Sequence, residues 1–213
     1  MYILKEMAYP QSFSFEEFDS ITSYSKKIKY ADQHLQKISS GSSRVIFKID
    51  DDKVLKVAKN VKGLAQNSVE RDAMIQQWYD DIVAKVFKIG EEVKNVGPFY
   101  LEMELAKRIS PKRFENILKF SVDDLKLFLT RQAFLHHKTK YNPRIDDEKL
   151  EYIMENPFVV DLWDMIQNFD MEYPGDFGRI NTYGEVIRNG IPKVVLIDYG
   201  LSEQVWVDYY KKN

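Results

Sequence analysis

The chain has 213 residues, of which 44% are apolar and 14% aromatic, so it can form one domain or two small lobes around a real core. Its formal net charge of −2 gives no general positive field for nucleic acid. Cysteine is absent, which excludes disulfides and thiolate metal sites and fits a reducing compartment. No signal-peptide pattern or membrane-length apolar run is present. We expect a soluble, cytoplasmic protein that binds neither nucleic acid nor membrane.

The N-terminal half alternates helical and strand patterns. Ser14 with Glu17 matches a capping box at the start of a helix whose apolar residues recur at helical spacing. An acidic turn separates two runs of strand type, which predicts an antiparallel hairpin. The elements expected in this half are helices at residues 12–30 and 63–79 and strands at residues 44–49, 53–58, 84–90 and 99–105.

The C-terminal half is mostly helical. Helices are expected near residues 122–138 and 146–169, and Pro157 should kink or split the second of them. Asn189 and Gly190 then predict a tight turn between two strands, because this dipeptide favours the hairpin conformation. A strand-rich half before a helix-rich half predicts an α+β fold with two lobes.

Three polar residues near the C-terminus carry the functional prediction. Residues 175–181 read GDFGRIN and residues 194–200 read VVLIDYG. Asp198 ends an apolar strand, where its carboxylate can project outward and bind Mg²⁺, and Asn181 offers an amide oxygen as a second ligand. Asp176 could orient an acceptor hydroxyl and take its proton. Phosphoryl transfer needs these parts, although each motif alone is also typical of a plain strand end and turn.

The N-terminal half offers partners for the phosphates of ATP. Lys56 lies within an apolar strand, where a lysine needs a counter-charge or must point to solvent. Glu70 on the following helix would pair with it and hold it toward the phosphates. Gly41 and Ser42 lie in a serine-rich turn whose backbone N–H groups could face the phosphates. The alternative is two exposed charges and an ordinary loop.

The order of these segments over residues 38–201 resembles that of the protein-kinase-like superfamily. The segments are the serine-rich turn, the strand VLKVA, Glu70, the strand LEMELA, the loop GDFGRIN and DYG. The GDFGRIN loop is similar to the Gly-Asp catalytic loop of aminoglycoside and choline kinases. The wider pattern resembles small kinase-like proteins of bacteriophages and bacteria. The resemblance implies ATP and Mg²⁺ as cofactors. It also implies an N-terminal helical extension (1–37), a nucleotide-binding lobe (38–106) and a reduced helical lobe (107–213).

The same resemblance implies an adenine site with Met103 as its gatekeeper. The hinge backbone that bonds the adenine edge would come from Glu104, Leu105 and Ala106. The side chains that would sandwich the ring are Val45, Val54 and Tyr183.

Only residues 201–213 follow Gly200, so we expect no activation segment, no Ala-Pro-Glu motif and none of the later peptide-docking helices of protein kinases. The expected function is ATP- and Mg²⁺-dependent transfer of phosphate to a protein Ser or Thr, or to a small-molecule hydroxyl. Two alternatives stay open. One is a non-catalytic regulator on a kinase-like scaffold that binds a host or partner protein, and the other is nucleotidyl transfer.

Overall fold

The computed structural model describes residues 12–75 and 79–211. An antiparallel N-terminal sheet with helices precedes a largely helical part, so the predicted α+β class is confirmed. The chain divides into two compact units: the first holds the residues up to Ser68 with Val86–Leu105, and the second holds Val69–Lys85 with the chain from Ala106 onward. The lobe boundaries expected from the sequence stay predictions.

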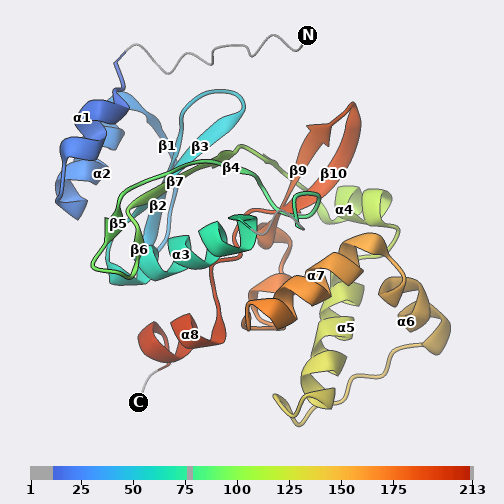
Figure 1. Ribbon diagram of the computed structural model, residues 1–213. Coiled ribbons are helices and arrows are strands. Elements are labelled where there is room, and N and C mark those ends of the chain that lie inside the picture. Colours follow the sequence, from blue (N-terminus) through green and yellow to red (C-terminus); the bar gives the residue numbers. More distant parts are fainter. Residues whose placement is uncertain (1–11, 76–78, 212–213) are drawn as a thin grey trace. The chain divides into compact units, whose positions relative to one another are not determined.

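The first unit is built on a five-stranded antiparallel sheet with the order β1-β2-β3-β7-β4 (Figure 1). Its strands are β1 (Gln36–Ser40), β2 (Arg44–Lys48), β3 (Lys53–Ala58), β7 (Tyr100–Glu104) and β4 (Val86–Ile89), with a short pair β5 (Glu92–Val93) and β6 (Gly97–Pro98) beside it. Four of the sheet strands match the predicted ones. Strand β1 was not predicted because all its residues are exposed, so its sequence lacks the apolar alternation of a half-buried strand.

The register of the β2–β3 hairpin decides which side chains share a face. Val45 lies opposite Val57, whereas the next residue, Ile46, lies opposite Lys56. Because successive side chains of a strand point to opposite faces, Val45 and Lys56 lie on different faces of the sheet. The face of Val45 also carries Phe47 and belongs to the buried aromatic core of this unit.

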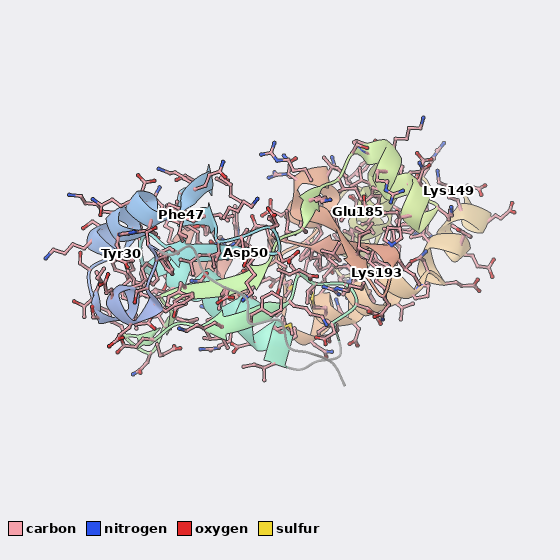
Figure 2. The ribbon with its side chains drawn as sticks, turned by 90° about the horizontal axis from the view of Figure 1, so that it is seen from above. Tyr30, Phe47, Asp50, Lys149, Glu185 and Lys193 are labelled. Atoms are coloured by element: carbon pink, nitrogen blue, oxygen red, sulfur yellow. The ribbon has the colours of Figure 1, made fainter. Side chains whose placement is uncertain are left out.

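Helices α1 (Phe15–Ser20) and α2 (Tyr24–His34) pack on the Val45 face, and Figure 2 labels Tyr30 and Phe47 from the two layers. The Ser14 hydroxyl caps α1 by accepting from the Glu17 N–H at 3.3 Å, but the Ser14 N–H donates to the Tyr30 hydroxyl at 3.1 Å and not to Glu17, so the predicted capping box is only half formed. The predicted single helix is broken, because Ile21 is extended and ends α1. Within the described part of this segment, two short helices therefore cover one face of the sheet.

Helix α3 (Val61–Ile75) contributes residues to both units. It matches the helix predicted over residues 63–79, of which 76–78 lie outside the described residues. Its N-terminal part belongs to the first unit and contributes buried polar residues, Gln66 and Asn67. Its part from Val69 onward belongs to the second unit.

The second unit combines helices with a small sheet of order β10-β9-β8 (Figure 1). Its further elements are β8 (Lys107–Arg108), α4 (Pro111–Leu118), α5 (Val122–Leu135), α6 (Asp147–Met154), α7 (Pro157–Asn168), β9 (Tyr183–Arg188), β10 (Ile191–Leu196) and α8 (Glu203–Tyr209). Pro157 splits the predicted long helix, because Asn156 caps α7 and the proline fills its first turn. Asn189 and Gly190 both have positive φ, so the predicted turn between β9 and β10 is confirmed.

Across residues 12–75 and 79–211, none of the helices combines the length and the apolar character needed to cross a membrane.

Candidate functional site

The GDFGRIN loop of the second unit folds into two short 3₁₀ turns, η1 (Asp176–Gly178) and η2 (Ile180–Thr182). The Thr182 hydroxyl donates to the Asp176 carbonyl at 2.6 Å, which fixes the backbone at this position. The Asp176 carboxylate accepts from the Arg179 guanidinium at 2.9 Å and its side chain is 42% exposed. The loop therefore holds Asp176 at its backbone and presents its carboxylate to solvent.

Asn181 and Asp198 are brought together by an extension of the β9–β10 pairing. The Ile197 N–H donates to the Thr182 carbonyl at 2.8 Å, one step beyond the last residues of the two strands. Asp198 directly follows Ile197, and Asn181, in the 3₁₀ turn η2, directly precedes Thr182. Both residues are exposed. A carboxylate and an amide, 17 positions apart in the chain, thus leave adjacent backbone segments at the same end of the hairpin.

This pair has the ligand chemistry of a Mg²⁺ site that is completed by phosphate and water. Mg²⁺ takes oxygen ligands, and it is commonly held by one or two carboxylates together with substrate phosphates. In the part of the chain that the structure describes, no group of three or more His, Asp or Glu side chains is arranged to hold a metal ion.

Glu70 is fully buried on α3 and is attached to the DYG segment. Its Oε1 accepts a hydrogen bond from the N–H of Tyr199 at 3.2 Å, and Tyr199 directly follows Asp198 in the chain. The sequence prediction did not find this contact, because nothing local connects two residues so far apart in the chain. The predicted pair of Glu70 with Lys56 stays a prediction, since the two residues belong to different units.

Lys56 lies in the middle of β3 and is only 3% exposed. It is opposite Leu101, and Val54 on the same face is opposite the predicted gatekeeper, Met103. Val54, Lys56 and Met103 therefore share the face that α1 and α2 do not cover. The nucleotide-binding roles expected for these three residues stay predictions.

The turn before β2 is closed on itself. The Gly41 N–H donates to the Arg44 carbonyl at 2.9 Å, so the prediction that this N–H faces phosphates is corrected. The Gly41 carbonyl accepts from the Lys59 ammonium at 2.8 Å, and the Ser42 carbonyl accepts from the Asn60 amide at 3.1 Å. These bonds hold the turn in one conformation. The role of Ser42 toward phosphate stays a prediction.

Two further adenine contacts expected from the resemblance need correction. Val45 belongs to the core on the face opposite Lys56, and Ile46 takes its place on the Lys56 face. The alternation in RVIFKI could have shown this, because Val45, Phe47 and Ile49 share one parity and Lys56 pairs with the other. The Leu105 N–H donates to the Asp52 carbonyl at 2.7 Å, so this part of the predicted hinge is already bonded. The hinge roles of Glu104 and Ala106 stay predictions.

Tyr183 is a core residue of the second unit rather than an adenine contact. It is 1% exposed, its hydroxyl donates to the Phe177 carbonyl at 2.7 Å, and its ring centroid lies 5.1 Å from that of Phe114. Burial raises the pKa of its phenol. The buried Tyr183 side chain supports the GDFGRIN loop, because its hydroxyl is hydrogen-bonded to the loop backbone at Phe177.

Gly184 of β9 makes a close contact that the sequence analysis did not predict. A Cβ added at Gly184 would lie 2.5 Å from the Ala106 Cβ and 3.1 Å from the Ile197 Cγ2. Gly184 therefore permits close contact between Ala106 and the hairpin. Ala106 and Ile197 thus lie close against the backbone of Gly184, and Ile197 directly precedes Asp198 in the chain.

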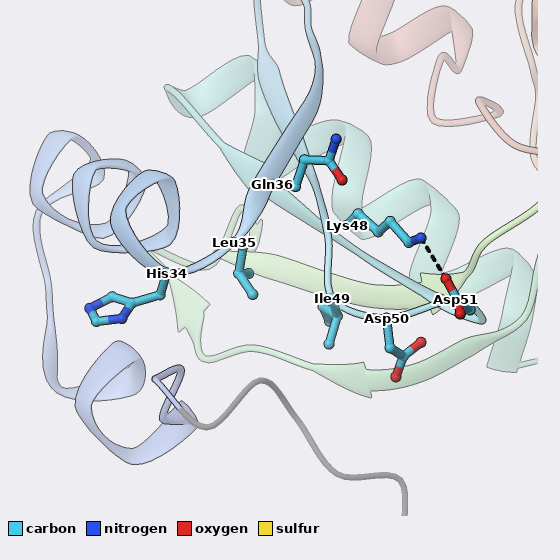
Figure 3. Close-up of a pocket in the computed structure, with 7 residues that line it drawn as sticks. All are labelled: His34, Leu35, Gln36, Lys48, Ile49, Asp50 and Asp51. Carbon is cyan, nitrogen blue, oxygen red and sulfur yellow. Dashed lines mark hydrogen bonds and ion pairs between the residues drawn. The ribbon is translucent and has the colours of Figure 1, made fainter.

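A shallow pocket of about 370 Å³ lies elsewhere on the first unit (Figure 3). It is lined by His34, Leu35, Gln36, Lys48, Ile49, Asp50 and Asp51, where α2 meets β1 and β2 turns into β3. The Lys48 ammonium is paired with the Asp51 carboxylate at 2.6 Å. Because none of the predicted site residues lines this pocket, we do not assign it to the candidate site.

No family model and no curated protein sequence matches this chain. A solved structure similar to it is the GDP and kanamycin complex of APH(2")-IIia, with 12% sequence identity and a TM-score of 0.38. The match covers 79% of this chain and 67% of that one. A likeness of this size does not identify the chemistry of the chain, so the functional assignment depends on the residues described above.

Proposed function

We propose that this chain is an ATP- and Mg²⁺-dependent phosphotransferase of the protein-kinase-like type. The observation that supports it best is the hydrogen bond from the Ile197 N–H to the Thr182 carbonyl, which joins the chain segments that carry Asp198 and Asn181, with Asp176 on the same loop as Asn181. Phosphoryl transfer requires a held cation and an oriented acceptor more than it requires covalent participation by the protein. The loop and the hairpin end offer residues for both tasks in a single compact unit.

Each proposed role follows from the chemistry of its side chain. The carboxylate of Asp198 and the amide oxygen of Asn181 would hold the cation, and Asp176 would orient the acceptor hydroxyl and accept its proton. Lys56 would bind phosphate oxygens. When bound, Mg²⁺-ATP would supply the transferable phosphoryl group and the neutralising positive charge. The proposed acceptor is a protein Ser or Thr, or the hydroxyl of a small molecule.

A label-transfer assay tests this proposal. The full chain is incubated with Mg²⁺ and ATP labelled at the γ-phosphate, alone, with cell lysate and with a panel of small alcohols. We expect transfer by the wild type and a loss of at least about a hundredfold in Asp198→Asn. Asp208→Asn, a neutralised carboxylate on α8, is the matched control and should keep full activity.

The same assay separates the proposal from a non-catalytic regulator. Binding of Mg²⁺-ATP, seen as a thermal shift, without transfer to any acceptor would favour the regulator. Full activity in Asp198→Asn would show that this residue does not hold the catalytic cation. Folding of each variant is checked by its circular dichroism spectrum and its unfolding midpoint.

A further inference from the structure

One lysine of the second unit contacts two chain segments that flank the candidate site in sequence. The Lys138 ammonium forms an ion pair with the Glu203 carboxylate, and it lies 4.3 Å from the centroid of the Tyr173 ring. Tyr173 shortly precedes Asp176 in the chain, and Glu203 shortly follows Asp198. Lys138 therefore joins the segment that leads into the GDFGRIN loop to the segment that follows DYG.

The same two segments are paired through their backbones. The Glu172 N–H donates to the Leu201 carbonyl at 3.0 Å, and the Glu203 N–H donates to the Asp170 carbonyl at 2.8 Å. An isolated antiparallel bridge lies between these two bonds. The chain that leaves DYG is thus held against the chain that enters the GDFGRIN loop, and the ion pair of Lys138 lies at the end of this pairing.

The end of helix α5 fixes the backbone of Lys138. The preceding residue, His137, has a positive φ of 61°. The His137 N–H donates to the Phe134 carbonyl at 3.0 Å, and the Lys138 N–H donates to the Ala133 carbonyl at 2.8 Å. These are the two hydrogen bonds of a Schellman motif, in which a left-handed residue turns the chain at the end of a helix. The side chain of Lys138 therefore starts from a well-defined position.

The contacts of Lys138 are suited to a local effect rather than to global stability. The side chains of Lys138 and Glu203 are 27% and 35% exposed, and ion pairs this close to solvent contribute little to stability. The cation over the Tyr173 ring adds a modest amount. Contacts of this strength still shift the balance between two positions of a short segment, because that balance responds to small differences in free energy.

We propose that Lys138 is a positioning residue for Asp198, acting through its ion pair with Glu203. This inference rests on the proposed function, because it takes Asp198 to be a ligand of the cation. The Ile197 and Tyr199 N–H groups already bond the chain directly before and after Asp198. Lys138 holds the residues that follow, so the segment that presents the carboxylate keeps one position.

Amide hydrogen exchange on the full chain, followed by nuclear magnetic resonance, tests the contact without any nucleotide. Lys138→Met removes the charge and keeps a long side chain. We expect the amide protons of Glu172 and Glu203 to exchange at least about threefold faster in this variant, while the amide of Leu129 in α5 keeps its rate. Lys138→Arg should restore the wild-type rates. Lys140→Met, at a nearby exposed position, is the matched control and should exchange like the wild type.

The affinity of the same variants for Mn²⁺ with a non-hydrolysable ATP analogue measures the effect on Asp198. We expect Lys138→Met and Glu203→Gln each to weaken this affinity about fivefold or more, because a smaller fraction of the chain then holds the binding position. Lys138→Arg should restore the affinity, and Lys140→Met should leave it unchanged. The double variant should bind no more weakly than Lys138→Met alone, because both changes remove the same ion pair.

The outcomes are distinguishable. Faster exchange with unchanged cation affinity in Lys138→Met would show that the ion pair has a structural role only, and unchanged exchange would show that it does not hold the segment. Either result overturns the inference and leaves the proposed function standing. If the wild type binds no Mn²⁺–nucleotide complex, the proposed function itself fails, and this inference with it. Should Lys138→Met not fold, the same two measurements on Glu203→Gln decide.

Discussion

The buried carboxylate of Glu70 accepts a hydrogen bond from the backbone N–H of Tyr199 at 3.2 Å, across 129 residues of chain. A hydrogen bond to a charged acceptor is stronger than one between neutral groups, and its removal leaves a buried donor unsatisfied. Tyr199 follows Asp198, so this bond fixes the backbone that presents the proposed metal ligand. Helix α3 thereby supports the backbone of the proposed site.

Glu70→Ala should therefore destabilise the protein by about 1–3 kcal/mol or more, while Glu70→Gln should cost less because its amide oxygen can still accept the bond. Urea denaturation measures both changes. In the label-transfer assay, Glu70→Ala should also lose activity under conditions where it is fully folded. Equal stability of the wild type and Glu70→Ala would contradict the assignment of this bond.

Ile46 and Val45 should respond differently to truncation. Val45→Ala removes buried core atoms on the α1–α2 face, so we expect a loss of about 1–3 kcal/mol in stability and unchanged nucleotide affinity. Ile46→Ala lies on the Lys56 face and should weaken nucleotide binding several-fold with a smaller loss of stability. Unfolding curves and nucleotide titrations on both variants check this. The reverse pattern would mean that the nucleotide binds to the other face.

Two glycines of the first unit should differ in their tolerance of alanine. A Cβ at Gly41 would meet only the Arg44 carbonyl oxygen, at 3.9 Å, so Gly41→Ala should be neutral or stabilise by up to about 1 kcal/mol. A Cβ at Gly97 would collide with the Leu64 carbonyl, so Gly97→Ala should destabilise by about 1–3 kcal/mol or more. Thermal melts compare them. A large loss of nucleotide binding in Gly41→Ala would show that the turn must be flexible.

The loss of folding stability at low pH should depend in part on the Arg113–Glu185 ion pair. The two hydrogen bonds from the Arg113 guanidinium, at 2.9 and 2.6 Å, hold the pKa of the Glu185 carboxyl below its ordinary value. A lowered folded-state pKa contributes stability at neutral pH that is lost as the pH falls below about 4.

Melting temperatures measured between pH 7 and pH 3 check this dependence. Glu185→Gln should lose less stability on acidification than the wild type does, and the effect should be small because the pair is partly exposed. Glu115→Gln, at an exposed position on α4, serves as the control and should follow the wild-type curve. Identical pH profiles for the wild type and Glu185→Gln would refute the contribution of the pair.

The elements with strong local signals were predictable from the sequence. Short sequence patterns predict these elements from backbone or side-chain chemistry. They are the apolar runs of β2 and β3, the Asn189-Gly190 turn and the proline that begins α7. Strand β1 has no such pattern, because it is an exposed edge strand. The break between α1 and α2 lies at the extended Ile21, and the helical spacing of the apolar residues around it did not indicate a break.

The candidate site divides in the same way. Asp176, Asn181 and Asp198 were identified from their order and their positions at loop and strand ends. The register of the strands decides which face of the sheet each residue occupies. Val45 and Ile46 are neighbours in sequence and lie on opposite faces, and only Ile46 shares the face of Lys56. The burial of Tyr183 and the contact of Glu70 arise from long-range packing. Sequence could name the residue types of the site more readily than the direction of each side chain.

We propose that Asp198 and Asn181 hold one divalent cation together with a nucleotide. Electron paramagnetic resonance with Mn²⁺ in place of Mg²⁺ tests this directly, because both cations take oxygen ligands. With the wild type and a non-hydrolysable ATP analogue, we predict one protein-bound Mn²⁺–nucleotide complex per chain, lost in Asp198→Asn and weakened in Asn181→Ala. A spectrum and an affinity that stay the same in Asp198→Asn would contradict the account.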